Sequence, residues 1–342
     1  GLESQEFAPR DIYLQYKNHG VQFRLGNQQV VWGESLGFFF ADIVNPKDTR
    51  EGGLGGDLAA QRINIPMANL SFLLGDYSLQ FLYIPKPFLN LTPAQGSDFA
   101  IPFSNFFGAT SYTLQDERIR PLSLSNSELG VRGTALLGGW DLAAFYFSYF
   151  DRRPSYRAEI DGASLLIRGV HDPIQSFGLT ATKDLETWVT RFELVYTRNR
   201  PIDAYDPNQL TPTLSYYNAL SDELVAVLGV DYTQWREWHL TFQVAQDSYL
   251  KNIPGALIRQ HSTNLSLILG GTVFQNHELT LIASYCPNDG GSLSQVLYMI
   301  PLSSRLEATF GAYLFAGPPP SQYGSFQRAN RAFFQLRAYF GS

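Results

Sequence analysis

The residues most able to do chemistry are few and widely separated in this chain. The single cysteine, Cys286, excludes an internal disulfide framework and a cysteine-based zinc site. The sequence contains no P-loop. The histidines show no metal-ligand spacing such as H-E-x-x-H, and they are His19, His171, His239, His261 and His277. We therefore expect that the protein is not an enzyme and that it binds neither a cofactor nor a metal ion.

Acidic and basic side chains form a second set, because many of them alternate with apolar residues. Arg191 and Glu193, for example, flank Phe192. If each run is a strand, its charged members all lie on one face. The residues placed on that face are Arg24, Glu128, Arg132, Arg191, Glu193, Asp231, His239, Asp247, Glu278, Glu307 and Arg337.

The elements that must position these side chains are β-strands. Strict alternation over about ten residues indicates a strand with one apolar and one polar face. The 237–249 and 305–316 segments show it clearly. Fifteen such segments lie near 12–17, 21–33, 62–74, 78–86, 127–138, 140–150, 174–184, 187–199, 222–233, 237–249, 262–274, 278–288, 293–301, 305–316 and 331–340.

The connections between these segments alternate in length. Short turns occur at Gly75-Asp76, Gly138-Gly139, Asp184–Glu186, Gln275–His277 and Ser303-Ser304. Longer, Pro- and Gly-rich connections cover 34–61, 87–126, 151–172, 200–221, 251–261 and 317–330, and the short 288–292 link lies on the same side. Short periplasmic turns alternating with long extracellular loops are typical of a transmembrane β-barrel.

A soluble β-sandwich or repeat array also has alternating strands. However, many segments here exceed the usual five or six residues and approach the roughly nine to eleven that cross a bilayer. Aromatic residues also gather at strand ends, as a girdle at the lipid–water boundary requires. They are Tyr77, Trp140, Trp188, Trp235 and Trp238.

We therefore predict an all-β fold: one closed antiparallel transmembrane β-barrel domain spanning residues 1–342. Bacterial barrels normally have an even number of strands, so about sixteen strands are expected, with fourteen as the alternative. The odd number of alternating segments, fifteen, has three explanations: a strand before residue 11, an upstream strand that this chain lacks, or a first segment that is not a strand.

The composition agrees with a membrane barrel. The 342 residues are 16% charged and 14% aromatic, and the mean hydropathy is -0.13. This aromatic content excludes disorder, and no apolar run reaches the roughly 18 residues of a spanning helix. The net charge of -6 argues against a nucleic-acid partner. The low charge is expected of a surface that faces lipid.

Charged groups that face an interior need water or partners. We therefore expect the charged set listed above to line a polar, hydrated pore, although the same charges could instead pair into a closed network. The 87–126 connection is long and unusually apolar. This connection either folds into the pore, as a constriction or ligand-binding loop, or packs on itself as an extracellular cap. The candidate residues for a constriction or ligand contact are Phe99, Phe103, Phe106 and Phe107.

The most distinctive stretch runs from Arg24 to Glu34 and continues from Asp42 to Arg50. It resembles R-x-G-x-Q-x-V-x-W-G-E followed by D-x-[VI]-N-P-x-D-x-R, the pattern of a porin-like proteobacterial outer-membrane family of unknown function. The 173–199 segment is similar to that family as well. The resemblance implies an outer-membrane barrel. Family members usually have further strands before the first motif, and they are suspected of moving hydrophobic or lipid-like compounds.

The same motif is a candidate for pinning the 34–61 loop to the barrel wall. Charge-assisted hydrogen bonds would hold the loop, and the Asn-Pro pair would set a turn. The motif residues assigned to this role are Trp32, Glu34, Asp42, Asn45, Pro46, Asp48 and Arg50.

Three functions follow from these features. The first is a porin-like channel for passive diffusion of small solutes across the outer membrane of a Gram-negative bacterium. The alternatives are a transporter or binding component for a hydrophobic compound, and a non-conducting scaffold for a partner complex. Expected partners are outer-membrane lipid and lipopolysaccharide, and the barrel assembly machinery, whose C-terminal signal the segment ending at Phe340 resembles. A protein partner or a separate N-terminal fragment is a further candidate.

Overall fold

The structure is a computed structural model that describes residues 11–51, 61–94, 96–100, 112–115, 120–161, 164–206, 216–274, 276–319 and 321–339. Fifteen antiparallel strands form its main sheet in chain order. They are β1 (Ile12–Asn18), β2 (Val21–Gln28), β3 (Ile65–Leu74), β4 (Tyr77–Ile84), β6 (Glu128–Leu137), β7 (Trp140–Phe150), β10 (Pro173–Asp184), β11 (Trp188–Tyr205), β12 (Tyr216–Tyr232), β13 (Trp238–Tyr249), β14 (His261–Val273), β15 (His277–Cys286), β16 (Gly291–Ser303), β17 (Leu306–Ala316) and β18 (Arg331–Ala338).

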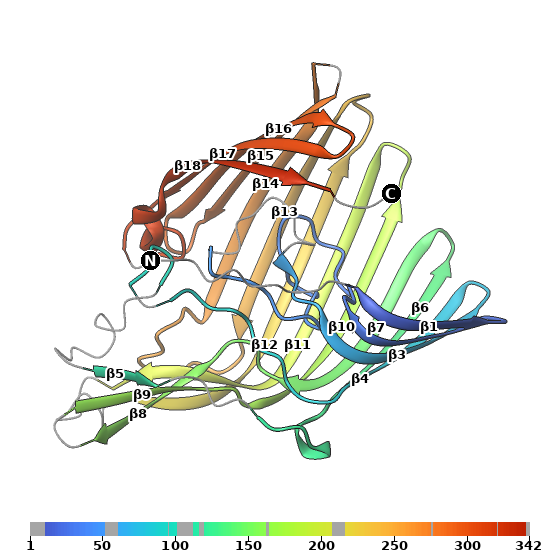
Figure 1. Ribbon diagram of the computed structural model, residues 1–342. Coiled ribbons are helices and arrows are strands. Elements are labelled where there is room, and N and C mark those ends of the chain that lie inside the picture. Colours follow the sequence, from blue (N-terminus) through green and yellow to red (C-terminus); the bar gives the residue numbers. More distant parts are fainter. Residues whose placement is uncertain are drawn as a thin grey trace.

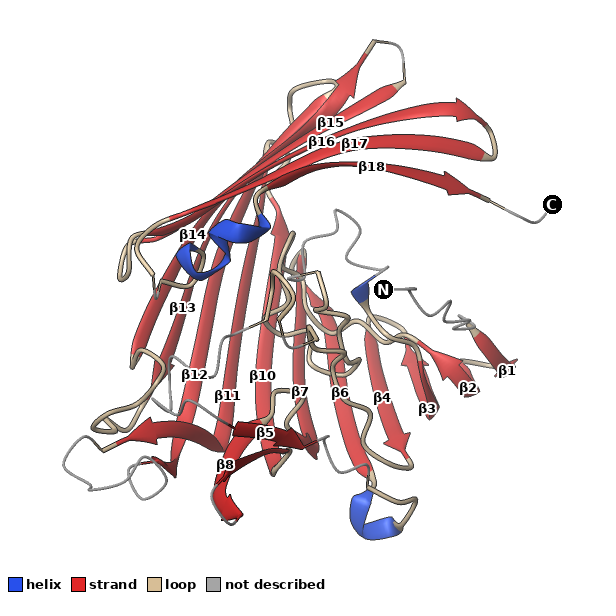
Figure 2. Cartoon of the chain, turned by 60° about the vertical axis from the view of Figure 1, so that its left-hand side comes forward, coloured by secondary structure: helices blue, strands red, loops and turns tan. Residues whose placement is uncertain are grey.

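The longer connections carry further structure. A small sheet has the order β5-β9-β8 and consists of β5 (Tyr112–Gln115), β8 (Ser155–Asp161) and β9 (Ser164–Val170). Two short 3-10 helices are η1 (Leu124–Asn126) and η2 (Gly324–Ala329). No helix among the described residues is long and apolar enough to cross a membrane. The main sheet curves strongly and has β1 and β18 at its two ends (Figures 1 and 2).

Tight turns set the register of several hairpins. His19 and Gly20 join β1 to β2 with φ angles of 38° and 82°, and Gly138 and Gly139 join β6 to β7 with 58° and 78°. Two successive positive φ angles are the pattern of a type I′ turn, whose twist matches that of the paired strands. Because a slip of one residue would exchange the two faces, these turns also decide which side chains point inward.

Each of the fifteen predicted segments overlaps one strand of the main sheet, so the all-β antiparallel prediction is confirmed. The predicted count of sixteen is not, because the sheet has fifteen strands in the described residues. The sixteenth strand came from the preference for even numbers and corresponded to no alternating segment. Some connections predicted as loops also contain strands: β5, β8 and β9 are examples, and β11 and β12 extend into 200–221.

The sheet is also not closed within the described residues, where β1 pairs only with β2 and β18 only with β17. The odd count explains why these two edges do not form another antiparallel pair. In an antiparallel sheet with fifteen strands in sequence, the first and last strands run in the same direction.

The two faces of the main sheet differ in chemistry. We call the face on the concave side the inner face; it carries Glu128, Glu193 and Gln243, each at most 1% exposed. Intervening residues such as Leu228 and Phe242 lie on the outer face and are about half exposed, at 53% and 46%. The connection between β2 and β3 lies on the inner side of the curve, whereas β5, β8, β9 and η1 lie at one rim of the main sheet (Figures 1 and 2).

Glycines on the inner face provide space for aromatic rings of neighbouring strands. Phe145 on β7 pairs with Gly178 on β10, and a Cβ atom at Gly178 would overlap the Phe145 ring. Phe145 is itself 5% exposed. Its position therefore depends on the absence of a side chain at residue 178.

We expect Gly178→Ala to displace Phe145 and to lower the free energy of unfolding by about 1–3 kcal/mol, the usual cost of overpacking a filled core. Gly133→Ala is the matched control, because the nearest heavy atom to its Cβ is 4.0 Å away. Urea unfolding of the refolded protein measures both variants. Equal stability of the two would contradict the packing argument.

Candidate functional site

The connection between β2 and β3 does not leave the sheet but crosses the inner face. We call residues 29–51 the inner segment. It runs from β2 past β4 and β7, reaches β11, β13 and β14, and returns to β3, as the contacts below establish. A segment in this position divides the space that the sheet curves around.

Trp32 fixes the outgoing arm of the inner segment, which is residues 29–33. Its side chain is fully buried, and Nε1 donates a hydrogen bond of 2.9 Å to Oε1 of Gln80 on β4. Its ring lies 5.0 Å from that of Phe145 and 5.7 Å from that of Phe147. A Cβ at Gly130 would lie 2.8 Å from the indole, so this glycine leaves room for the ring.

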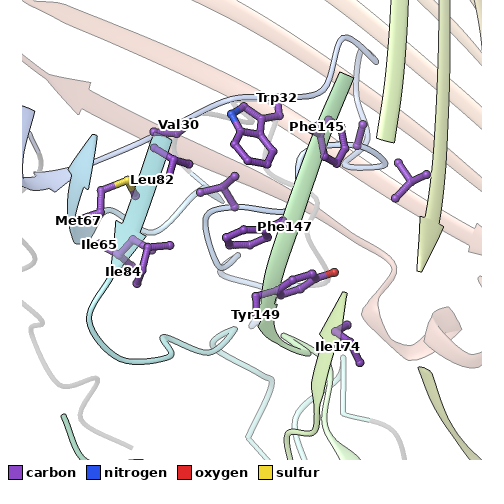
Figure 3. Close-up of a cluster of buried hydrophobic side chains, with 13 residues drawn as sticks. Val30, Trp32, Ile65, Met67, Leu82, Ile84, Phe145, Phe147, Tyr149 and Ile174 are labelled. Atoms are coloured by element: carbon purple, nitrogen blue, oxygen red, sulfur yellow. The ribbon is translucent and has the colours of Figure 1, made fainter. Parts of the chain in front are cut away.

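Trp32 belongs to an apolar cluster of thirteen buried residues (Figure 3). The inner segment contributes Val30, Trp32, Ala41 and Val44, and strands of the main sheet contribute the rest. The sequence predicted a polar interior, and this part of the inner face is apolar instead. The reason is that a segment carrying its own apolar side chains needs an apolar surface to pack against.

We call residues 34–41 the tip of the inner segment. The tip is bound by the carboxylate of Glu193 on β11. Oε1 accepts hydrogen bonds from the backbone amides of Glu34 and Ser35, the latter at 2.6 Å. Oε2 accepts one from the amide of Ala41 at 3.0 Å. Hydrogen bonds to an ionised acceptor are about twice as strong as neutral ones. Glu193 was predicted to line a pore, and the structure places it under the tip.

The tip extends beyond Glu193 to the next strands. The side-chain amide of Gln243 on β13 both accepts from the Leu36 amide (3.0 Å) and donates to the Leu36 carbonyl (2.7 Å). Gly37 adopts a φ of +74°, and a Cβ there would lie 2.9 Å from Ile268 on β14. Sequence reasoning missed Gln243, because a glutamine in an alternating strand carries no special signal.

Asn45 ties the two arms of the inner segment together. Its Oδ1 accepts from the Val30 amide at 2.8 Å, and its Nδ2 donates to the carbonyls of Gln28 and Ile63 at 3.2 and 2.8 Å. The carbonyl of Pro46 accepts from the Ile63 amide at 2.9 Å. The Asn-Pro pair therefore joins both arms to the start of β3.

Most charged residues of the motif form ion pairs in or near the returning arm of the inner segment, which is residues 42–51. Asp42 accepts from Nε of Arg62 at 2.5 Å, and Lys47 Nζ lies 3.4 Å from the same carboxylate. Burial lowers the pKa of Lys47 to about 8 in spite of Asp42. Asp48 binds Arg50, two residues further along, at 2.7 Å, so this pair stiffens the segment itself.

Two ion pairs link β6 to connections between strands. Glu128 and Arg152 form a buried bidentate pair at 2.7 and 2.6 Å. The same guanidinium donates to the carbonyls of Val44 and Phe88 at 3.0 and 2.6 Å, which joins two connections to β6. The Glu34 carboxylate lies 3.5 Å from Arg132. Arg152 was not predicted, because it lies outside the alternating segments.

The other predicted lining residues also lie on the inner face but do not form one cluster. Arg191 pairs with Asp231, which accepts from Thr241 at 2.7 Å. Arg337 pairs with Glu307 at 3.1 Å. The remaining ones lie apart along the face: Arg24 donates to Gln15 at 3.0 Å, His239 lies against Gly270, Asp247 is partly buried and Glu278 is exposed.

Of the predicted constriction residues, only Phe99 lies within the described part of the chain; Phe103, Phe106 and Phe107 lie outside it. The ring centroid of Phe99 lies 5.9 Å from the ring centroids of both Phe315 and Phe326. Cζ of Arg331 lies over the Phe99 ring, 5.1 Å from its centroid. Arg328 of η2 donates to the carbonyls of residues 97, 98 and 100. Phe99 therefore anchors its connection to β17 and η2.

We expect Glu193→Gln to loosen the tip, because an amide nitrogen replaces one of the two acceptors and faces a backbone N–H. An unpaired buried donor costs about 1–3 kcal/mol. Hydrogen exchange of the amides of residues 34–41 should accelerate. Glu307→Gln is the control, since Glu307 pairs with Arg337 away from the segment. Unchanged protection at residues 34–41 would show that Glu193 does not hold the tip.

Comparisons with known proteins identify a family. A family described as "Protein of unknown function (DUF1302)" matches residues 3–291. The comparison with curated proteins found no match. Similar solved structures include OccK8 (OprE) of Pseudomonas aeruginosa, which is 10% identical with a TM-score of 0.46 over 89% of this chain and 75% of that one. Another is OmpT, an outer membrane protein of Vibrio cholerae, 12% identical with a TM-score of 0.38 over 81% of this chain and 89% of that one. Because the family match extends over most of the sequence, this chain belongs to the DUF1302 family.

Proposed function

We propose that this protein is a porin-like channel of the bacterial outer membrane, and that the inner segment narrows its passage. Small solutes cross it by diffusion, without chemical change. The observation that carries the proposal is the opposite chemistry of the two faces of one large antiparallel sheet.

The outer face supports a membrane position. Exposed apolar side chains occur on it from β3 to β18, and a water-soluble protein rarely exposes an apolar surface of such extent. Members of this surface include Leu74, Phe81, Leu129, Phe177, Phe192, Leu228, Phe242, Leu267, Tyr285, Val296, Phe310 and Phe334. Tyr77, Trp140, Trp188 and Trp235 near the short turns are also exposed, as an interfacial girdle requires.

The inner face supports a passage. A barrel of about this many strands can surround an aqueous channel, whereas eight strands cannot. The inner segment reaches from β2 to β14 across this space. Beside its tip, the Arg132–Glu34 and Arg191–Asp231 pairs place opposite charges within the lumen, which predicts a weak charge preference.

The tip of the inner segment can be removed to test its role. Gly33 and Asp42 are neighbours in space: a Cβ at Gly33 would lie 2.9 Å from the Asp42 amide. We expect excision of residues 34–41, with one glycine joining Gly33 to Asp42, to raise single-channel conductance in a planar bilayer. Gly133→Ala, a change on the outer face with no heavy atom closer than 4.0 Å to the added Cβ, should leave the conductance near that of the native protein. An excised variant with native conductance would contradict the constriction.

The membrane position can be tested separately. Leu228 and Leu129 are both 53% exposed on the outer face. Leu228 lies within β12, whereas Leu129 is the second residue of β6. We expect Leu228→Arg to destabilise the protein in lipid vesicles by about 2–4 kcal/mol and Leu129→Arg by about 0–1 kcal/mol, since the cost of a charge depends on depth. Equal small effects would indicate a water-exposed surface.

A further inference from the structure

The inner face has a second apolar region, away from the cluster around Trp32. We call it the apolar strip: Ile268 on β14, Ile282 on β15, Leu297 and Met299 on β16, and Phe333 on β18. Ile268 is buried, and the other four are partly exposed. In a water-filled channel the inward positions are expected to be polar. A partly exposed apolar strip therefore needs an explanation.

Strand pairing places the members of the strip as direct or diagonal neighbours, since Ile282 is directly opposite Gln295, two residues before Leu297. Ile268 is directly opposite Ile282, and Leu297 is directly opposite Gly311 of β17. Gly311 is in turn opposite Phe333, whose ring occupies the space that a Cβ at Gly311 would fill. Thr280 and Gln295 lie beside these residues and supply polar groups. The strip thus crosses five neighbouring strands.

The strip begins where the tip of the inner segment ends. A Cβ at Gly37 would lie 2.9 Å from Ile268. The partly exposed Phe38 and Phe40 follow Gly37, with ring centroids 6.0 Å apart. Solutes that pass the tip on this side therefore meet phenylalanine rings and an aliphatic wall. Both surfaces lie on the inner side of the sheet, so neither faces lipid.

The chain itself shows how an aromatic ring sits on the adjoining wall. Phe99 arrives from a distant connection and packs against Phe315 and Phe326, while Arg331 covers its ring. Phe333 stacks on Tyr313 with ring centroids 5.0 Å apart. This end of the inner face accommodates rings next to polar groups.

We propose that the apolar strip and the tip form a selective site for small solutes that combine an aromatic ring with a polar or charged group. The inference rests on the proposed channel function. Weak contact of the ring with the strip raises the local solute concentration but still allows release, which is the condition for transport through a pore. Purely hydrophilic solutes of similar size gain nothing from the strip.

Liposome swelling with two probes, phenylacetate and gluconate, tests whether the apolar strip and the tip form this selective site. Both are monoanions, and only phenylacetate carries a ring. We expect the native protein to admit phenylacetate faster by about fivefold to tenfold, the factor that follows when roughly half of a phenyl ring leaves water. The Leu297→Asn/Met299→Gln variant should lose most of this preference while gluconate entry stays unchanged.

The Leu297→Ile/Met299→Leu variant is the matched control and should keep the preference, because the strip stays apolar at similar volume. A preference that is absent in the native protein, or that survives the polar variant, would overturn the selective site and leave the channel intact. Failure of both probes to enter through the native protein would overturn the proposed channel function, and the selective site with it.

Discussion

The main sheet has to satisfy two different surroundings with alternate residues of the same strands, and this constraint governs the rest of the structure. Because backbone hydrogen bonds are made between strands, side chains alone decide what each face can contact. The outer face is apolar and exposed, as Leu228 and Phe242 illustrate. The inner face carries buried polar groups such as Glu193 and Gln243, which find their partners in the inner segment.

The inner segment is held by three kinds of contact that support one another. Trp32 packs on the apolar cluster, Asn45 joins the two arms, and the Glu193 carboxylate binds amides on both sides of the tip. A buried carboxylate needs several donors, and unpaired amides in a tight loop need acceptors. Each partner thus satisfies a requirement of the other. This fixes the segment across the inner face.

Much of the strand pattern could be predicted because alternation is a local property. The segment at 237–249 contains β13 with its ends nearly correct, and each of the other fourteen segments also matches a strand. The count of sixteen failed because it came from a general preference rather than from residues. In the small β5-β9-β8 sheet, β5 was missed because its pairing with β9 joins two distant connections. β8 and β9 form a hairpin within 151–172, a range predicted to be a loop.

The sequence by itself determined the β-strands, their two faces and a motif from Arg24 to Arg50 with the residue types of a fixed loop. It also placed Arg191, Glu193 and Asp231 on a common face. Only the tertiary structure decided that Glu193 binds the tip, that Arg152 joins two connections to Glu128, and that part of the inner face is apolar. Glu193 and Ala41 are 152 positions apart, and Arg152 and Val44 are 108 apart. No local period in a sequence records which distant backbone amides will meet a carboxylate.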